Sequence, residues 1–62
     1  MSTYNYAAIE SALQRAHDLL KDELEILTNV QANPELIAEY KSDMELISKA
    51  AVIVFMYEEL EH

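Results

Sequence analysis

The chain has 62 residues, no cysteine and no glycine, and its twelve acidic residues against four basic ones give a net charge of −8. A chain of this length forms at most one domain, and without disulfides or a cysteine-based zinc site it buries too little apolar surface to be comfortably stable alone. The negative charge argues against a nucleic-acid partner and against attraction to an anionic membrane surface.

Apolar residues in the first half recur every three or four positions, which predicts an amphipathic helix over about residues 4–32. Its main stripe consists of Tyr6, Ile9, Leu13, Ala16, Leu20, Leu24 and Leu27. Ser2, Thr3 and Asn5 are each candidates for the N-cap. A second apolar row lies about 100° from this stripe on the helical wheel. It consists of Ala8, Ala12, Leu19, Ile26 and Val30.

The single proline interrupts the helical pattern near the midpoint, in Gln31-Ala32-Asn33-Pro34-Glu35. Asparagine is a favourable N-cap, proline suits the first helical position, and glutamate in the first turn interacts well with the helix dipole. The residue before a proline is also disfavoured in the helical conformation. We therefore expect a second helix over about residues 34–59, after a connection short enough to make the two helices antiparallel.

The second half carries a matching main stripe of Leu36, Ile37, Tyr40, Met44, Ile47, Ala51 and Val54. A second row follows here too, formed by Leu46, Ile53 and Tyr57. Val52 and Met56 continue a face that is polar earlier in the helix, so the segment from Ala50 to Tyr57 is apolar all round. Such a segment requires burial on every side, which a hairpin alone does not provide.

We therefore expect residues 1–59 to form a single all-α domain, an antiparallel two-helix hairpin completed by dimerisation or by a partner chain. The residues expected to bind the other chain are Leu19, Ile26, Leu46, Val52, Ile53, Phe55, Met56 and Tyr57. Methionine and tyrosine suit such a surface because methionine adapts its shape and the tyrosine hydroxyl can stay hydrated. Tyr40 lies on the main stripe and is expected in the core.

Residues 60–62, Leu60-Glu61-His62, match the start of a vector-encoded histidine tag, so we expect the native chain to end near Glu59. The sequence does not begin with a signal-peptide pattern, and its longest uncharged apolar run, Ala50 to Tyr57, is too short to span a bilayer. A cytoplasmic location without membrane insertion is the resulting expectation.

No motif in the sequence points to catalysis, a cofactor or a metal ion. His17, the one histidine before residue 62, lies at the edge of the main stripe, and Gln14 stands where a di-iron helix bundle would carry a glutamate. The carboxylates follow the outward faces, no hydroxyl residue has a base at a recognisable spacing, and a phosphate-cradling loop would need glycine. We therefore expect a non-enzymatic protein.

The second half also carries a resemblance to a known family. It runs from the aromatic Tyr40 through Met44-Glu45-Leu46-Ile47-Ser48-Lys49-Ala50-Ala51-Val52-Ile53-Val54-Phe55-Met56-Tyr57. In this pattern the chain resembles the small cytoplasmic co-chaperones of type III secretion needle proteins (the YscE/EscE/SsaE family), which are short helical hairpins. The resemblance implies a protein that binds a larger, helical-repeat chaperone. Together the two would keep the needle subunit unpolymerised in the cytoplasm before export.

A second resemblance concerns the connection and the start of the second helix, Asn33-Pro34-Glu35-Leu36-Ile37-Ala38-Glu39-Tyr40-Lys41-Ser42. This segment is similar to the corresponding part of the needle subunit itself. The needle subunit continues into a longer helix with an Asn/Gln-containing polar stretch, whereas this chain is apolar from Ala50. Two alternatives stay open beside the co-chaperone: a structural homodimer in which two hairpins form a four-helix bundle, and a needle-subunit-like protein.

Overall fold

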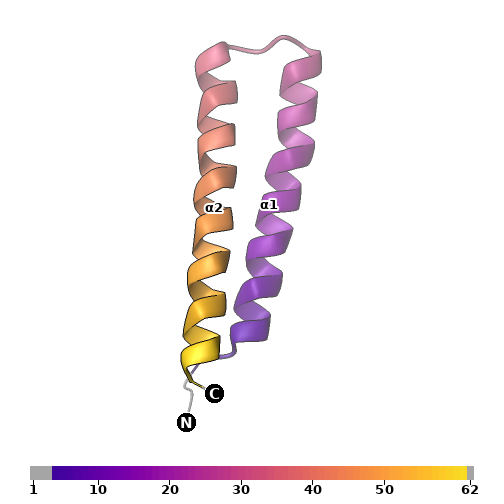
Figure 1. Cartoon of the computed structure of the whole chain (residues 1–62). Coiled ribbons are helices and arrows are strands. Elements are labelled where there is room, and N and C mark those ends of the chain that lie inside the picture. The colour runs from indigo at the N-terminus through magenta and orange to yellow at the C-terminus, as the bar shows by residue number, and fades with distance from the viewer. Residues whose placement is uncertain (1–3, 62) are drawn as a thin grey trace.

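A computed structural model describes residues 4–61 of the chain. Two α-helices, α1 over Tyr6–Asn29 and α2 over Pro34–Leu60, run antiparallel and pack against each other (Figure 1). No strand occurs within this described range. The hairpin measures 48 × 15 × 13 Å along its principal axes, so it is a thin rod. The expected all-α two-helix hairpin is thus confirmed.

Helix α1 begins at Tyr6, slightly later than the expected start at residue 4. Its N-cap is Asn5, whose side-chain oxygen accepts a hydrogen bond from the backbone N–H of Ala8 at 3.0 Å. This bond satisfies one of the N–H groups that the first turn of a helix leaves unpaired. The other two N-cap candidates, Ser2 and Thr3, lie outside the described residues.

Helix α1 ends at Asn29, before the expected end at Ala32, because the chain closes it with a left-handed residue. Gln31 takes a positive φ of 55°. Its N–H donates to the carbonyl of Thr28 at 3.1 Å, and the N–H of Ala32 donates to that of Leu27 at 2.9 Å. This is the Schellman arrangement, which satisfies the last carbonyls of a helix. Sequence patterns did not reveal it because the left-handed position holds glutamine where glycine is usual.

Helix α2 begins as its sequence predicted. The side-chain oxygen of Asn33 accepts a hydrogen bond from the backbone N–H of Glu35 at 2.8 Å, and Pro34 occupies the first turn. Glu35 places its negative charge at the positive end of the helix dipole. The helix continues to Leu60, one residue beyond the expected boundary at Glu59, so the first residue of the expected tag sequence is helical.

The core is the single seam between the two main stripes. Apart from Leu36, which is 38% exposed, every residue of both predicted stripes is half-buried, Tyr40 included. No residue between positions 4 and 61 is fully buried. Two helices bring one face of each into contact, so a large part of the apolar surface stays outside the seam.

Candidate protein-interaction surface

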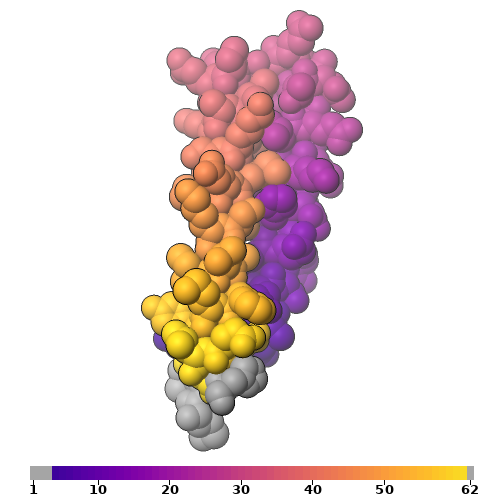
Figure 2. Space-filling view, viewed as in Figure 1, coloured from indigo at the N-terminus to yellow at the C-terminus, as the bar shows by residue number. Residues whose placement is uncertain are grey.

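The C-terminal half of α2 exposes large apolar side chains around its whole outward side. Val52, Ile53, Phe55, Met56 and Tyr57 are each between 52% and 58% exposed. At about 100° per residue, these side chains point in nearly every direction except toward α1. Figure 2 shows this part of α2 in orange to yellow, at the end of the hairpin away from the loop. An exposed apolar patch of this kind is typical of a protein-interaction site.

All eight residues predicted to bind a partner are exposed in the hairpin. Besides the five of the C-terminal half of α2, Leu19, Ile26 and Leu46 are 69%, 57% and 59% exposed. Helical periodicity therefore separated the side chains of the seam from those that the hairpin leaves uncovered. Their role in binding stays a prediction.

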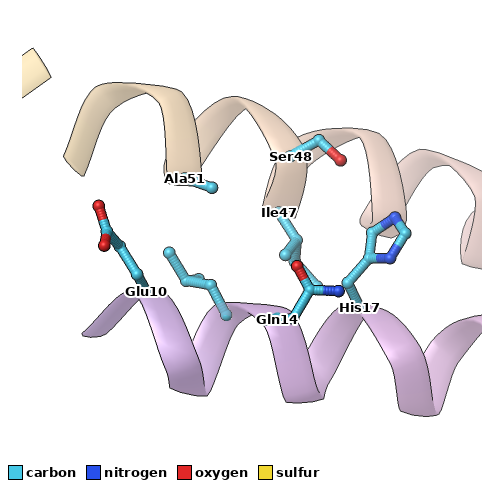
Figure 3. Close-up of a pocket in the computed structure, with 7 residues that line it drawn as sticks. Glu10, Gln14, His17, Ile47, Ser48 and Ala51 are labelled. Atoms are coloured by element: carbon cyan, nitrogen blue, oxygen red, sulfur yellow. The ribbon is translucent and has the colours of Figure 1, made fainter. Parts of the chain in front are cut away.

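These eight residues lie on two sides of the hairpin. Gln14 and His17, on one flank of the α1 stripe, share a shallow depression with Ser48, on one flank of the α2 stripe (Figure 3). Those two flanks therefore face the same side, and the opposite flanks of both helices face the other side. We call this other side the seam face; its apolar residues are Ala8, Ala12, Leu19, Ile26 and Val30 of α1 and Leu46, Ile53 and Tyr57 of α2.

A ridge on α2 is formed by Val52, Phe55 and Met56. Helical periodicity places it on a different side of the helix from the seam face. Met56 connects the two surfaces, because it lines a shallow, mostly apolar depression together with Ile53, Tyr57 and Leu60. The apolar surface therefore continues around α2 from the seam face to the ridge. A partner that covers both would have to wrap around this end of the helix.

The open end of the hairpin adds aromatic residues that sequence reasoning left out of the binding set. Tyr4 is 64% exposed, and its ring centroid lies 6.1 Å from that of Tyr6. Both tyrosines line a depression with Ile9, Val54 and Tyr57. Tyr4 precedes α1, so helical periodicity did not identify it. The available signal was antiparallel pairing, which brings the first residues of a hairpin beside its last.

The depression on the side opposite the seam face holds the polar side chains that a chemical site would need. Glu10, Gln14 and His17 rise from α1 toward α2, and Ile47 reaches toward them from α2 (Figure 3). The Gln14 side-chain amide donates to a carboxylate oxygen of Asp18 at 3.0 Å, so it is engaged along α1. Within residues 4–61, no group of three or more His, Asp and Glu side chains is placed to hold a metal ion.

Comparison with known proteins finds no family model, curated protein or solved structure that matches this chain. Neither α1 nor α2, as far as the structure describes them, combines the length and apolar character that crossing a membrane requires. The exposed surface and the sequence resemblance are therefore the observations from which a function can be inferred.

Proposed function

We propose that this chain is a non-enzymatic co-chaperone of a type III secretion system that acts in the cytoplasm. It binds a helical-repeat chaperone, and together they keep the needle subunit unpolymerised before export. The observation that carries the binding part of this proposal is the exposed apolar surface of the seam face and the ridge. The resemblance in the segment from Tyr40 to Tyr57 supports the assignment to needle-protein export.

The dimensions of the hairpin suit a partner built from helical repeats. Such proteins stack helix pairs into an extended concave surface, which can receive a thin helical rod along its length. An amphipathic helix that lays its apolar face into a groove is a recurring mode of recognition, with anchors one or two turns apart. Leu19 and Ile26 on α1 and Leu46 and Ile53 on α2 are spaced two turns apart and provide such anchors.

The placement of the second rows also favours a second candidate, the structural homodimer. Both rows face the same side of the hairpin, so two copies can pack seam face to seam face and form a four-helix bundle. This arrangement buries the same side chains as the co-chaperone complex. The two candidates therefore differ in the identity of the covering chain.

The experiment that tests the proposal is reconstitution with the gene neighbours of this chain. A helical-repeat protein and a needle subunit encoded beside it are co-expressed with and without the chain, and the state of the needle subunit is measured by size-exclusion chromatography. We expect a complex in which the needle subunit stays monomeric only when all three proteins are present. A needle subunit that polymerises equally with and without the chain would refute the proposal.

The test variant for this experiment changes only the seam face, and its control changes only the outward sides of the helices. Leu19→Asp combined with Ile53→Asp should abolish the complex, because each places an unpaired charge in the interface. Asp at two exposed polar positions, Ser11→Asp with Ser42→Asp, adds the same charge on the outward sides of the helices. This control should form the complex as the unchanged chain does.

A further inference from the structure

Three carboxylates accompany the apolar residues of the seam face in the half of the hairpin nearest the loop. On α1, Glu23 lies one turn from both Leu19 and Ile26 and therefore shares their flank. It is also one turn from the stripe residues Leu20 and Leu27, so it lies nearer the seam than Asp22 does. On α2, Glu39 and Asp43 lie two turns and one turn before Leu46 and share its flank. All three carboxylates are on exposed residues. We call them the acidic flank.

The register of the hairpin brings the three residues of the acidic flank together. Leu13 and Ala51 line the same depression across the seam, so residues of α1 and α2 that are equally far from the loop lie level with each other. By this register Glu23 lies beside the turn of α2 that begins at Glu39 and ends at Asp43. The acidic flank is therefore one patch that both helices contribute.

The lysines of this half of the hairpin lie on the other side. Lys21 is one turn from His17 and Lys41 is two turns from Ser48, and both His17 and Ser48 line the depression opposite the seam face. Among the described residues, Glu23, Glu39 and Asp43 make no ion pair. Near the loop the seam face is thus apolar and negatively charged, without a cation of its own to balance the charge.

We propose that the seam face receives an amphipathic helix whose apolar stripe is flanked by lysine or arginine in the half that meets the acidic flank. The apolar residues supply the contact area, and opposite charges beside them set the register and direction of the docked helix. This inference rests on the proposed function and adds the chemistry of the partner's docking helix.

A second copy of this chain complements the seam face less well. The chain carries a net charge of −8, and packing two seam faces together brings both acidic flanks to one interface. The cations nearest that side by helical periodicity are Arg15 on α1 and Lys49 on α2. Lys49 is already paired with Glu45 at 3.3 Å. Like charges at an interface disfavour a wrong partner. The acidic flank therefore weakens self-association while it favours a basic helix.

The test uses the full chain and two synthetic helical peptides of equal length and identical leucine stripe. Lysines flank the stripe over one half of the first peptide, and glutamates take the same positions in the second. Binding is measured by fluorescence anisotropy at low and at high salt. We expect the lysine peptide to bind about tenfold or more tightly than the glutamate peptide at low salt. This advantage should shrink at high salt, where exposed charges are screened.

Neutralising the acidic flank should affect binding and self-association in opposite directions. The variant Glu23→Gln/Glu39→Gln/Asp43→Asn is expected to lose affinity for the lysine peptide on the order of tenfold. Its self-association, followed by sedimentation equilibrium, should become stronger than that of the unchanged chain. Both changes are expected while the helical circular dichroism signal is retained, because all three side chains are exposed.

The control variant Glu10→Gln/Asp18→Asn/Glu25→Gln removes the same charge from the side of α1 away from the seam face, where Glu10 lines the opposite depression, and should bind the lysine peptide as the unchanged chain does. Equal losses in the two variants, or equal binding of the two peptides, would overturn the proposal.

The variant Leu19→Ser with Ile53→Ser distinguishes failure of this inference from failure of the proposed function. If the serine variant binds neither peptide while the charge changes have no effect on binding, the seam face is the docking surface. Only the proposed chemistry of the partner helix is then wrong. If the serine variant loses neither peptide, the docking surface itself is wrong.

Discussion

Replacing Val52 and Met56 together with aspartate tests whether the ridge serves binding or folding. The two side chains are 58% and 57% exposed, and a helical side chain leans over the preceding turn of its own helix. The expected cost to the hairpin is then mainly helix propensity, about 0.5 kcal/mol and nearly all from Met56→Asp, because valine and aspartate have similar propensities. In an interface, each unpaired buried charge costs several kcal/mol, and every 1.4 kcal/mol is about tenfold in affinity. Association should therefore fall by orders of magnitude while helicity largely survives.

The assay combines circular dichroism with sedimentation equilibrium, and it compares this double variant with Leu20→Asp. Leu20 is half-buried on the main stripe, so a charge there should unfold the hairpin. Ser11→Asp with Ser42→Asp controls for the two added charges and should change neither signal. If the Val52/Met56 variant loses its helical signal as completely as the Leu20 variant, those side chains belong to the hairpin's own core. The interpretation of the ridge as a binding surface would then be wrong.

Three further substitutions test the local structure, each by chemical denaturation followed by circular dichroism. Gln31→Gly should stabilise the hairpin by about 1 kcal/mol, since glycine adopts the positive φ of this position without steric cost; an unchanged or lower stability would contradict the left-handed closure of α1. Asn33→Ala should destabilise it by about 1 kcal/mol through loss of the N-cap bond to Glu35, and no loss would show that the cap contributes nothing. Lys49→Ala should change stability by less than about 0.5 kcal/mol, because its 3.3 Å ion pair with Glu45 is largely exposed; a larger loss would mean that the pair is more than a surface contact.

Helical periodicity was sufficient to predict the seam of this fold. In a hairpin of two helices, the only tertiary contact available to each helix is along one stripe, so spacing of three and four identifies the core directly. Ile9, Leu20 and Ile47 are examples of stripe residues that the structure half-buries. The start of α2 was equally predictable, because Asn33 and Pro34 are both favoured at the positions that they occupy.

The end of α1 and the division of the exposed residues into two sides were not predictable in the same way. The Schellman closure depends on Gln31 adopting a positive φ, for which glutamine has no particular preference. Which flank of α1 faces the same side as which flank of α2 depends on how the helices are oriented after the connection. A helical wheel drawn for each helix separately does not contain this information. The same reason kept the acidic flank hidden, since Glu23 and Asp43 lie on different helices.

Sedimentation of the purified chain over a wide range of concentration tests most directly the central claim, that another chain must cover the seam face and the ridge. We predict reversible self-association that increases with concentration and that a covering partner helix reverses, since apolar side chains such as Ile53 and Met56 are more than half exposed in the single hairpin. A clean monomer with a high melting temperature at every concentration would contradict the account, because the hairpin would then be stable with these side chains in water.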